Sequence, residues 1–92
     1  MLREDVEPVV AALQARGVFA HVHHASTTRV GIRVVLSGGR EAIWDTDGAA
    51  GLEAMIMRNG VLVGFVPKIP GSADFTREQT VEAIAGADYG EG

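Results

Sequence analysis

The stretch that most constrains this chain is RVGIRVVLSGGREAIWDT, which covers residues 29 to 46. Two runs rich in Val and Ile flank the pair Gly38-Gly39. Glycine readily adopts the positive φ angles that a tight two-residue hairpin turn needs. We therefore predict an antiparallel hairpin in which Ser37 faces Arg40.

This pairing sorts the side chains of the hairpin onto two faces, because successive residues of a strand point to opposite sides of the sheet. One face receives the aliphatic residues Ile32, Val34, Leu36 and Ile43. The other face receives Arg33, Val35, Ala42 and Trp44. We predict that the aliphatic face forms the core and that Trp44 lies on the opposite face, where it can stack on Arg33.

The segment VFAHVHH, residues 18 to 24, predicts a strand that precedes the hairpin. Two registers compete. One register turns His21 and His23 to the apolar face. The other pairs His24 with Val30 and turns the Val and Ala residues of the segment there instead. The apolar pattern favours the second register, which leaves His21 and His23 on the outward face.

A second hairpin is predicted around Asn59-Gly60, the strongest short hairpin signal in the chain, which separates LEAMIMR from VLVGFV. Pairing Arg58 with Val61 again defines two faces. The first face carries Ala54, Ile56 and Phe65. The second face carries Met55, Met57 and Leu62. Both faces are largely apolar, so we expect the hairpin to be covered on both sides.

Residues 49 to 58 have a competing interpretation as a short helix, because Ala, Leu, Glu, Met and Arg are good helix formers. Gly48 and Gly51 weaken the start of such a helix. The Asn59-Gly60 pair, followed at once by a β-type run, favours the strand.

Helices are predicted at both ends of the chain. Apolar residues at i, i+3, i+4 and i+7 predict a helix over residues 5 to 16. They are Val6, Val9, Val10 and Leu13. Thr76 and Gln79 have the spacing of a capping box and open a second helix that ends at Gly86. Residues 87 to 92 are expected to be a frayed tail.

The predicted fold is therefore α+β: an antiparallel meander of about five strands flanked by an N-terminal and a C-terminal helix, in one domain over residues 1 to 92. The residues expected on the helix-covered face are Val18, Val22, Ile32, Val34, Ile43, Ile56 and Phe65. A domain this short buries a modest core, so oligomerisation would add useful stability.

Composition narrows the classes of function. The net charge is −4, which disfavours nucleic acid, where neutralisation of phosphates supplies most of the affinity. The chain has no cysteine and no apolar run of the roughly 18 residues that cross a membrane. We predict a cytoplasmic protein, such as a small accessory protein of a bacterium or phage.

His21 and His23 are the candidate metal ligands, because two imidazoles two residues apart on a strand point the same way. A full site needs a further ligand, and a pair of solvated histidines explains the pattern as well. No motif for nucleophilic catalysis is present. We expect no enzyme activity and no cofactor, with a metal- or histidine-dependent enzyme as the alternative and a weak nucleic-acid binder as the second alternative.

The candidate partner-binding residues share the outward face of the predicted sheet. They are Arg33, Trp44, Met55, Met57 and Leu62. Met, Trp and Arg are enriched at protein interfaces. Alternatively, a helix or the loop over residues 67 to 74 covers this face within the monomer. The predicted function is a non-catalytic protein-binding or assembly module, acting as a homodimer.

Overall fold

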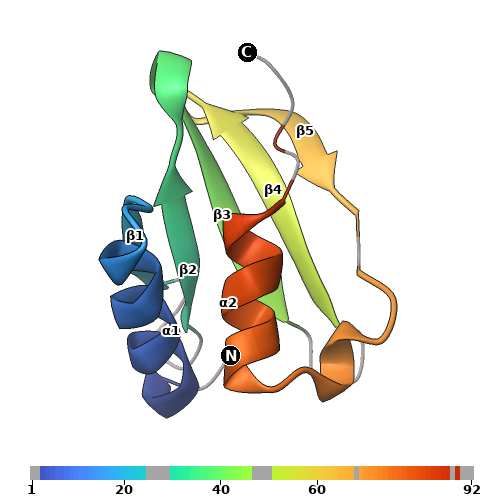
Figure 1. Cartoon of the computed structure of the whole chain (residues 1–92). Helices are drawn as coiled ribbons and strands as arrows, with labels where there is room; N and C mark the ends of the chain where they lie inside the picture. Colours follow the sequence, from blue (N-terminus) through green and yellow to red (C-terminus); the bar gives the residue numbers. More distant parts are fainter. Residues whose placement is uncertain (1–2, 25–29, 47–50, 68, 88, 90–92) are drawn as a thin grey trace.

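The computed structural model of the chain describes residues 3–24, 30–46, 51–67, 69–87 and 89. Its helices and strands are α1 (Arg3–Ala15), β1 (Ala20–His24), β2 (Val30–Val35), β3 (Arg40–Thr46), β4 (Leu52–Arg58), β5 (Val61–Val66) and α2 (Arg77–Ala85). The five strands form one antiparallel sheet in the order of the chain (Figure 1). The predicted α+β meander with a helix at each end is confirmed.

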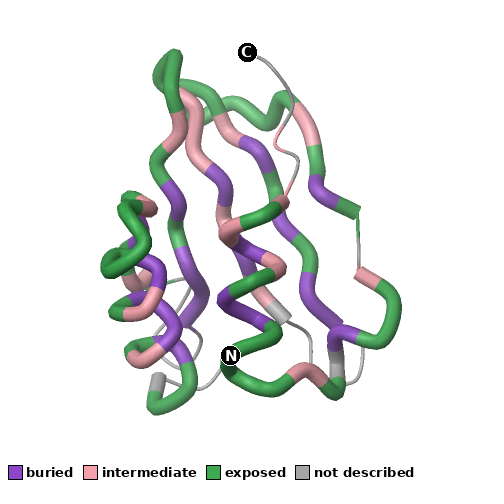
Figure 2. Tube along the Cα trace, in the orientation of Figure 1, coloured by how far each residue is buried: buried purple, intermediate pink, exposed green. Residues whose placement is uncertain are grey.

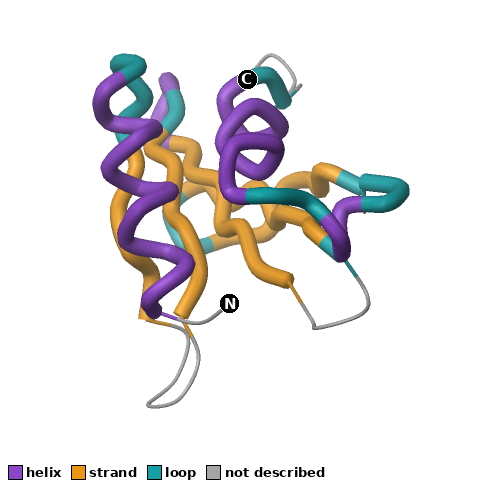
Figure 3. Tube along the Cα trace, turned by 60° about the horizontal axis from the view of Figure 1, so that its bottom comes forward, coloured by secondary structure: helices purple, strands orange, loops and turns teal. Residues whose placement is uncertain are grey.

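Both helices lie on the same side of the sheet (Figure 3). We call this side the inner face and the opposite side the outer face. Buried and exposed residues alternate along the strands, as expected for a sheet covered on one side (Figure 2). The buried core consists of Val6, Val9, Val10, Leu13, Ala20, Val30, Ile32, Val34, Ala42, Trp44, Leu52, Ala54, Ile56, Val66, Val81 and Ile84.

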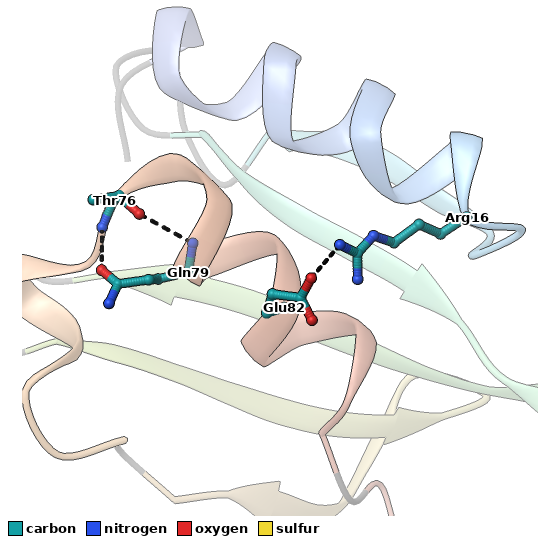
Figure 4. Close-up of polar contacts among 4 residues, drawn as sticks. All are labelled: Arg16, Thr76, Gln79 and Glu82. Atoms are coloured by element: carbon teal, nitrogen blue, oxygen red, sulfur yellow. Dashed lines mark hydrogen bonds and ion pairs between the residues drawn. The ribbon is translucent and has the colours of Figure 1, made fainter.

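The helix signals in the sequence are confirmed, with a small shift at the first start. Helix α1 begins at Arg3, two residues before the predicted start, and ends at Ala15. Helix α2 has the predicted capping box (Figure 4). Thr76 Oγ1 accepts from the Gln79 N–H at 3.2 Å, and Gln79 Oε1 accepts from the Thr76 N–H at 2.8 Å. These bonds satisfy two N–H groups that a helix start otherwise leaves unpaired.

Strands β1 and β2 pair in the register that the apolar pattern favours. His24 lies opposite Val30 and Val22 lies opposite Ile32. Ala20 is fully buried, and Val22 packs against the core. His21 therefore lies on the outer face, where its partner across the ladder is Arg33.

The register between β2 and β3 differs by one residue from the prediction. The loop contains three residues, Ser37–Gly39, and the Leu36 N–H donates to the Arg40 carbonyl at 2.9 Å. Ile32 therefore faces Trp44, and Arg33 faces Ile43.

This slip turns β3 over, so the predicted placement of Trp44 on the outer face was wrong. Trp44 is fully buried under the helices with Ala42, whereas Ile43 lies on the outer face. The physical reason is burial: the predicted register would have turned Glu41 and Asp45 into the core. Burying two carboxylates costs far more than exposing Ile43.

The second hairpin forms as predicted at its turn and departs from the prediction further along. Residues 52–58 form a strand, and Arg58 lies opposite Val61 across Asn59 and Gly60, which both have positive φ. A bulge then shifts the register between Ile56 and Met57.

The bulge reverses the side on which the end of β5 lies. Beyond the bulge, Met55 faces Phe65 and Ala54 faces Val66. Phe65 was predicted in the core and lies instead on the outer face, 67% exposed, while Val66 takes the buried position. Val63 is the extra residue, without a partner in the ladder.

Tyr89 is packed onto the core, although residues 87 to 92 were expected to be a frayed tail. Trp44 Nε1 donates to Tyr89 Oη at 3.1 Å, and Tyr89 Oη donates to the Ile84 carbonyl at 2.7 Å. The Trp44 and Tyr89 rings meet edge to face with centroids 6.1 Å apart. Burial raises the pKa of Tyr89 above its ordinary value. Residues 88 and 90–92 of the expected tail lie outside the described part of the chain.

Candidate interaction surface on the outer face of the sheet

The ladder registers arrange the outer face as two parallel rows of side chains that cross the whole sheet. The first, which we call the Phe65 row, is His21, Arg33, Ile43, Met55 and Phe65. The second, the Leu62 row, is Phe19, Val35, Glu41, Met57 and Leu62. Phe19 extends the β1–β2 ladder by one step, since its carbonyl accepts from the Val35 N–H at 2.8 Å. Neighbours within a row are close enough for their side chains to touch.

Large apolar side chains are exposed in both rows: Phe19 and Val35 lie at the β1–β2 end, and the others lie on β4 and β5. Met55 and Leu62 are each 45% exposed, and Phe65 is 67% exposed. Met57 lies between them, half-buried. We call Met55, Met57, Leu62 and Phe65 the apolar outer patch. A contiguous exposed apolar patch of this kind marks an interaction site more often than chance.

The charged groups of the two rows lie on the other half of the face, over β2 and β3. Arg33 Nε donates to the Glu41 carboxylate, and both side chains keep partial contact with solvent. The pair spans the two rows, because Arg33 belongs to the Phe65 row and Glu41 to the Leu62 row. Asp45 and Glu53 face each other in a further row, on the side of the Phe65 row away from the Leu62 row, and make that end of the face acidic.

Four of the five predicted partner-binding residues share the outer face. Arg33 is exposed on β2, while Met55, Met57 and Leu62 belong to the apolar outer patch. Trp44 is sealed in the core and does not contribute.

Sequence reasoning missed Phe19 and Phe65 as outer-face residues. For Phe65 a usable signal was Gly64, since glycine inside a strand often marks a bulge. For Trp44, the signal was that Glu41 and Asp45 share a face of β3 with Ile43. Burying Ile43 would therefore bury two carboxylates as well.

The two candidate metal ligands, His21 and His23, lie on the outer side of β1 as expected. His24, the next residue, alternates to the other side. Among the described residues, no group of three or more His, Asp or Glu side chains is placed to hold a metal ion. None of the helices in the described part of the chain is long and apolar enough to span a membrane.

An open hollow of about 510 Å³ lies beside the start of α2. Its lining residues are Phe75, Thr76, Glu78, Gln79, Glu82 and Ala83. Apart from the half-buried Phe75 and Ala83, these side chains are exposed. The hollow therefore lacks the enclosed apolar walls of a typical small-molecule site.

Comparison with protein-family models, with curated proteins and with solved structures found no match to this chain. Its function is therefore inferred from its own geometry.

Proposed function

We propose that this chain is a non-catalytic protein-binding and assembly module that works through the outer face of its sheet, as a homodimer. The observation that carries the proposal is the exposure of Met55, Leu62 and Phe65 on the outer face of the sheet. Burying such a side chain from full exposure contributes roughly 1.5–3 kcal/mol, so covering the exposed part of each one contributes a fraction of this and is favourable.

The composition of the face supports a protein partner. Met and aromatic residues are enriched at protein interfaces, and the apolar outer patch contains two Met and one Phe. The net charge of −4 argues against a phosphate-rich partner. A chain without cysteine suits a reducing compartment, and we place the proposed assembly in the cytoplasm.

Sedimentation equilibrium at micromolar concentrations tests the proposal. Leu62→Ser removes an exposed apolar residue from the outer face. Val61→Ser is the matched control, because Val61 is 63% exposed on the same strand but faces the other side. We expect the wild type and Val61→Ser to dimerise and Leu62→Ser to dissociate. A wild-type chain that stays monomeric at the highest concentration reached would overturn the proposal.

The alternative function is a metal- or histidine-dependent activity at His21 and His23, favoured by their shared side of β1. Thermal melting of untagged protein with and without zinc tests it. On the assembly proposal, we expect the same melting temperature in both. A zinc-dependent rise that His21→Ala abolishes would favour the alternative.

A further inference from the structure

We infer that the partner on the outer face is a second copy of this chain, related by a two-fold axis that runs across the strands between the Phe65 row and the Leu62 row. This inference rests on the proposed function and specifies its geometry. A closed two-fold dimer requires a surface that complements itself, so each alternative contact can be compared on that criterion.

The free edge of β5 is the first alternative, because an apolar edge strand can pair with another chain. The bulge in β5 opposes such edge-to-edge pairing. Leu62 and Phe65 both lie on the outer face, yet they are three residues apart because Val63 is inserted between the paired positions. A regular strand places same-face residues two apart, so an added strand cannot follow β5 along its length.

Face-to-face packing is the contact that covers the apolar outer patch, and two directions of the axis keep the strands of the two subunits aligned. An axis parallel to the strands would lay β5 of one subunit over β1 of the other. The apolar outer patch would then cover Arg33, and Glu41 on the central strand would face its own copy, so like charges would meet. An axis across the strands lays each strand over its own copy. The apolar outer patch then covers its own copy, and apolar surface is buried against apolar surface.

The Arg33–Glu41 pair fixes where that axis crosses the sheet. If the axis ran along the Phe65 row, Arg33 would face its own copy, and like charges would meet. An axis between the rows exchanges them, so Met55 lies over Met57 of the partner subunit and Phe65 over Leu62 of the partner subunit. Glu41 of the partner subunit then lies above Ile43, which is one strand spacing, about 4.8 Å, from Arg33. The four charges alternate in sign, which favours this arrangement over its competitors.

The area of the outer face is sufficient for a weak dimer. Five strands span about 19 Å, and six residues along a strand span about 20 Å, so the projected area is roughly 400 Å² per subunit. Protruding side chains raise the accessible area above this projection. The interface is therefore smaller than the standard size of about 800 Å² per partner, and we expect weak, micromolar affinity.

Spin-label distances test the direction of the axis. The chain has no cysteine, so His21→Cys and Glu53→Cys each introduce one labelling site outside the apolar outer patch. His21 lies in the Phe65 row, next to the inferred axis, whereas Glu53 lies one row further away. With sheets about 10 Å apart and rows about 7 Å apart, the two His21 positions are about 12 Å apart and the two Glu53 positions about 23 Å apart.

The expected result is therefore a shorter distance between His21 labels than between Glu53 labels. An axis parallel to the strands reverses the order, to about 22 Å and about 14 Å. That result would overturn the inferred geometry and leave the proposed dimer standing. If neither label shows coupling and sedimentation gives a monomer, the proposed function fails and the geometry fails with it.

Discussion

The two faces of the sheet are built from the same strands and contain comparable apolar side chains, yet the helices of the described part of the chain cover only one (Figure 3). On β3 and β4 the inner face has Trp44 and Ile56, and the outer face has Ile43 and Met55. Hydrophobicity alone does not separate these sets. The helices cover the face that carries Trp44, the largest fully buried side chain of the described residues. A small domain with two helices can cover one face, and on the proposed function the second apolar face is left for a partner.

Replacing one aromatic residue on each face gives the sharpest test of this difference. Trp44→Ala should destabilise the fold by about 3–5 kcal/mol, because it empties a buried site and removes the partner of Tyr89. Phe65→Ala should change the stability of the monomer by less than about 0.5 kcal/mol. Urea denaturation at a concentration low enough to keep the chain monomeric measures both. Equal losses would mean that the outer face is buried within the monomer.

Two glycines extend the comparison to the backbone. A Cβ at Gly31 would lie 2.3 Å from the Trp44 carbonyl oxygen, so Gly31→Ala should cost about 1–3 kcal/mol. Gly64→Ala is the matched control, because its Cβ would meet the Ile56 side chain at an ordinary 3.8 Å. Thermal melting of the two variants measures the difference. A Gly31→Ala variant as stable as wild type would contradict the close approach of β2 and β3.

The hydrogen bond between Trp44 and Tyr89 should make the next largest contribution to the stability of the fold. Tyr89→Phe keeps the ring but leaves the buried indole N–H without its acceptor, which should cost about 1–3 kcal/mol. Trp44 is the only tryptophan, so its fluorescence reports unfolding directly. A neutral Tyr89→Phe variant would show that water replaces the phenol.

The same phenol predicts a loss of stability in alkali. Burial raises the pKa of Tyr89 above the ordinary 10.0, so the unfolded chain ionises first as the pH rises. The stabilising contribution is complete below pH 10 and disappears as the pH passes through the raised pKa. Tyr89 is the only tyrosine, so phenolate absorbance follows it alone. Titration at the value of the unfolded chain would contradict its packing against Trp44.

The ion pair between Arg16 and Glu82 should have the smallest effect, although it joins the end of α1 to α2 (Figure 4). Its hydrogen bond lowers the pKa of Glu82, so any stabilisation is present above the ordinary carboxyl pKa and lost as the pH falls through the lowered one. Both groups are exposed, and exposed pairs contribute little. Glu82→Gln should melt at nearly the wild-type temperature. A clear loss would mean that the pair holds the two helices together.

Most of the architecture could be predicted from local signals. The capping box at Thr76, the Asn59-Gly60 turn and the alternation in β1 each give one physical solution, and the structure has it.

The face on which the side chains of β3 and of the end of β5 lie could not be predicted from such signals. In each case it depends on whether the loop or the strand contains one additional residue. Gly38 and Gly39 suit a two-residue or a three-residue loop, and a bulge has only a weak signature. The predicted sides of Trp44 and Phe65 were therefore wrong, and partner binding by the outer face stays a prediction.

The three-residue loop Ser37–Gly39 has a consequence for how this protein can change over generations. Surface turns ordinarily accept insertions and deletions with little harm. Here, loss or gain of one amino acid would rotate every later side chain of β3 by half a turn, placing two acids beneath the helices and Trp44 in water. Natural variants should therefore preserve the length of this loop more strictly than the identities of its amino acids.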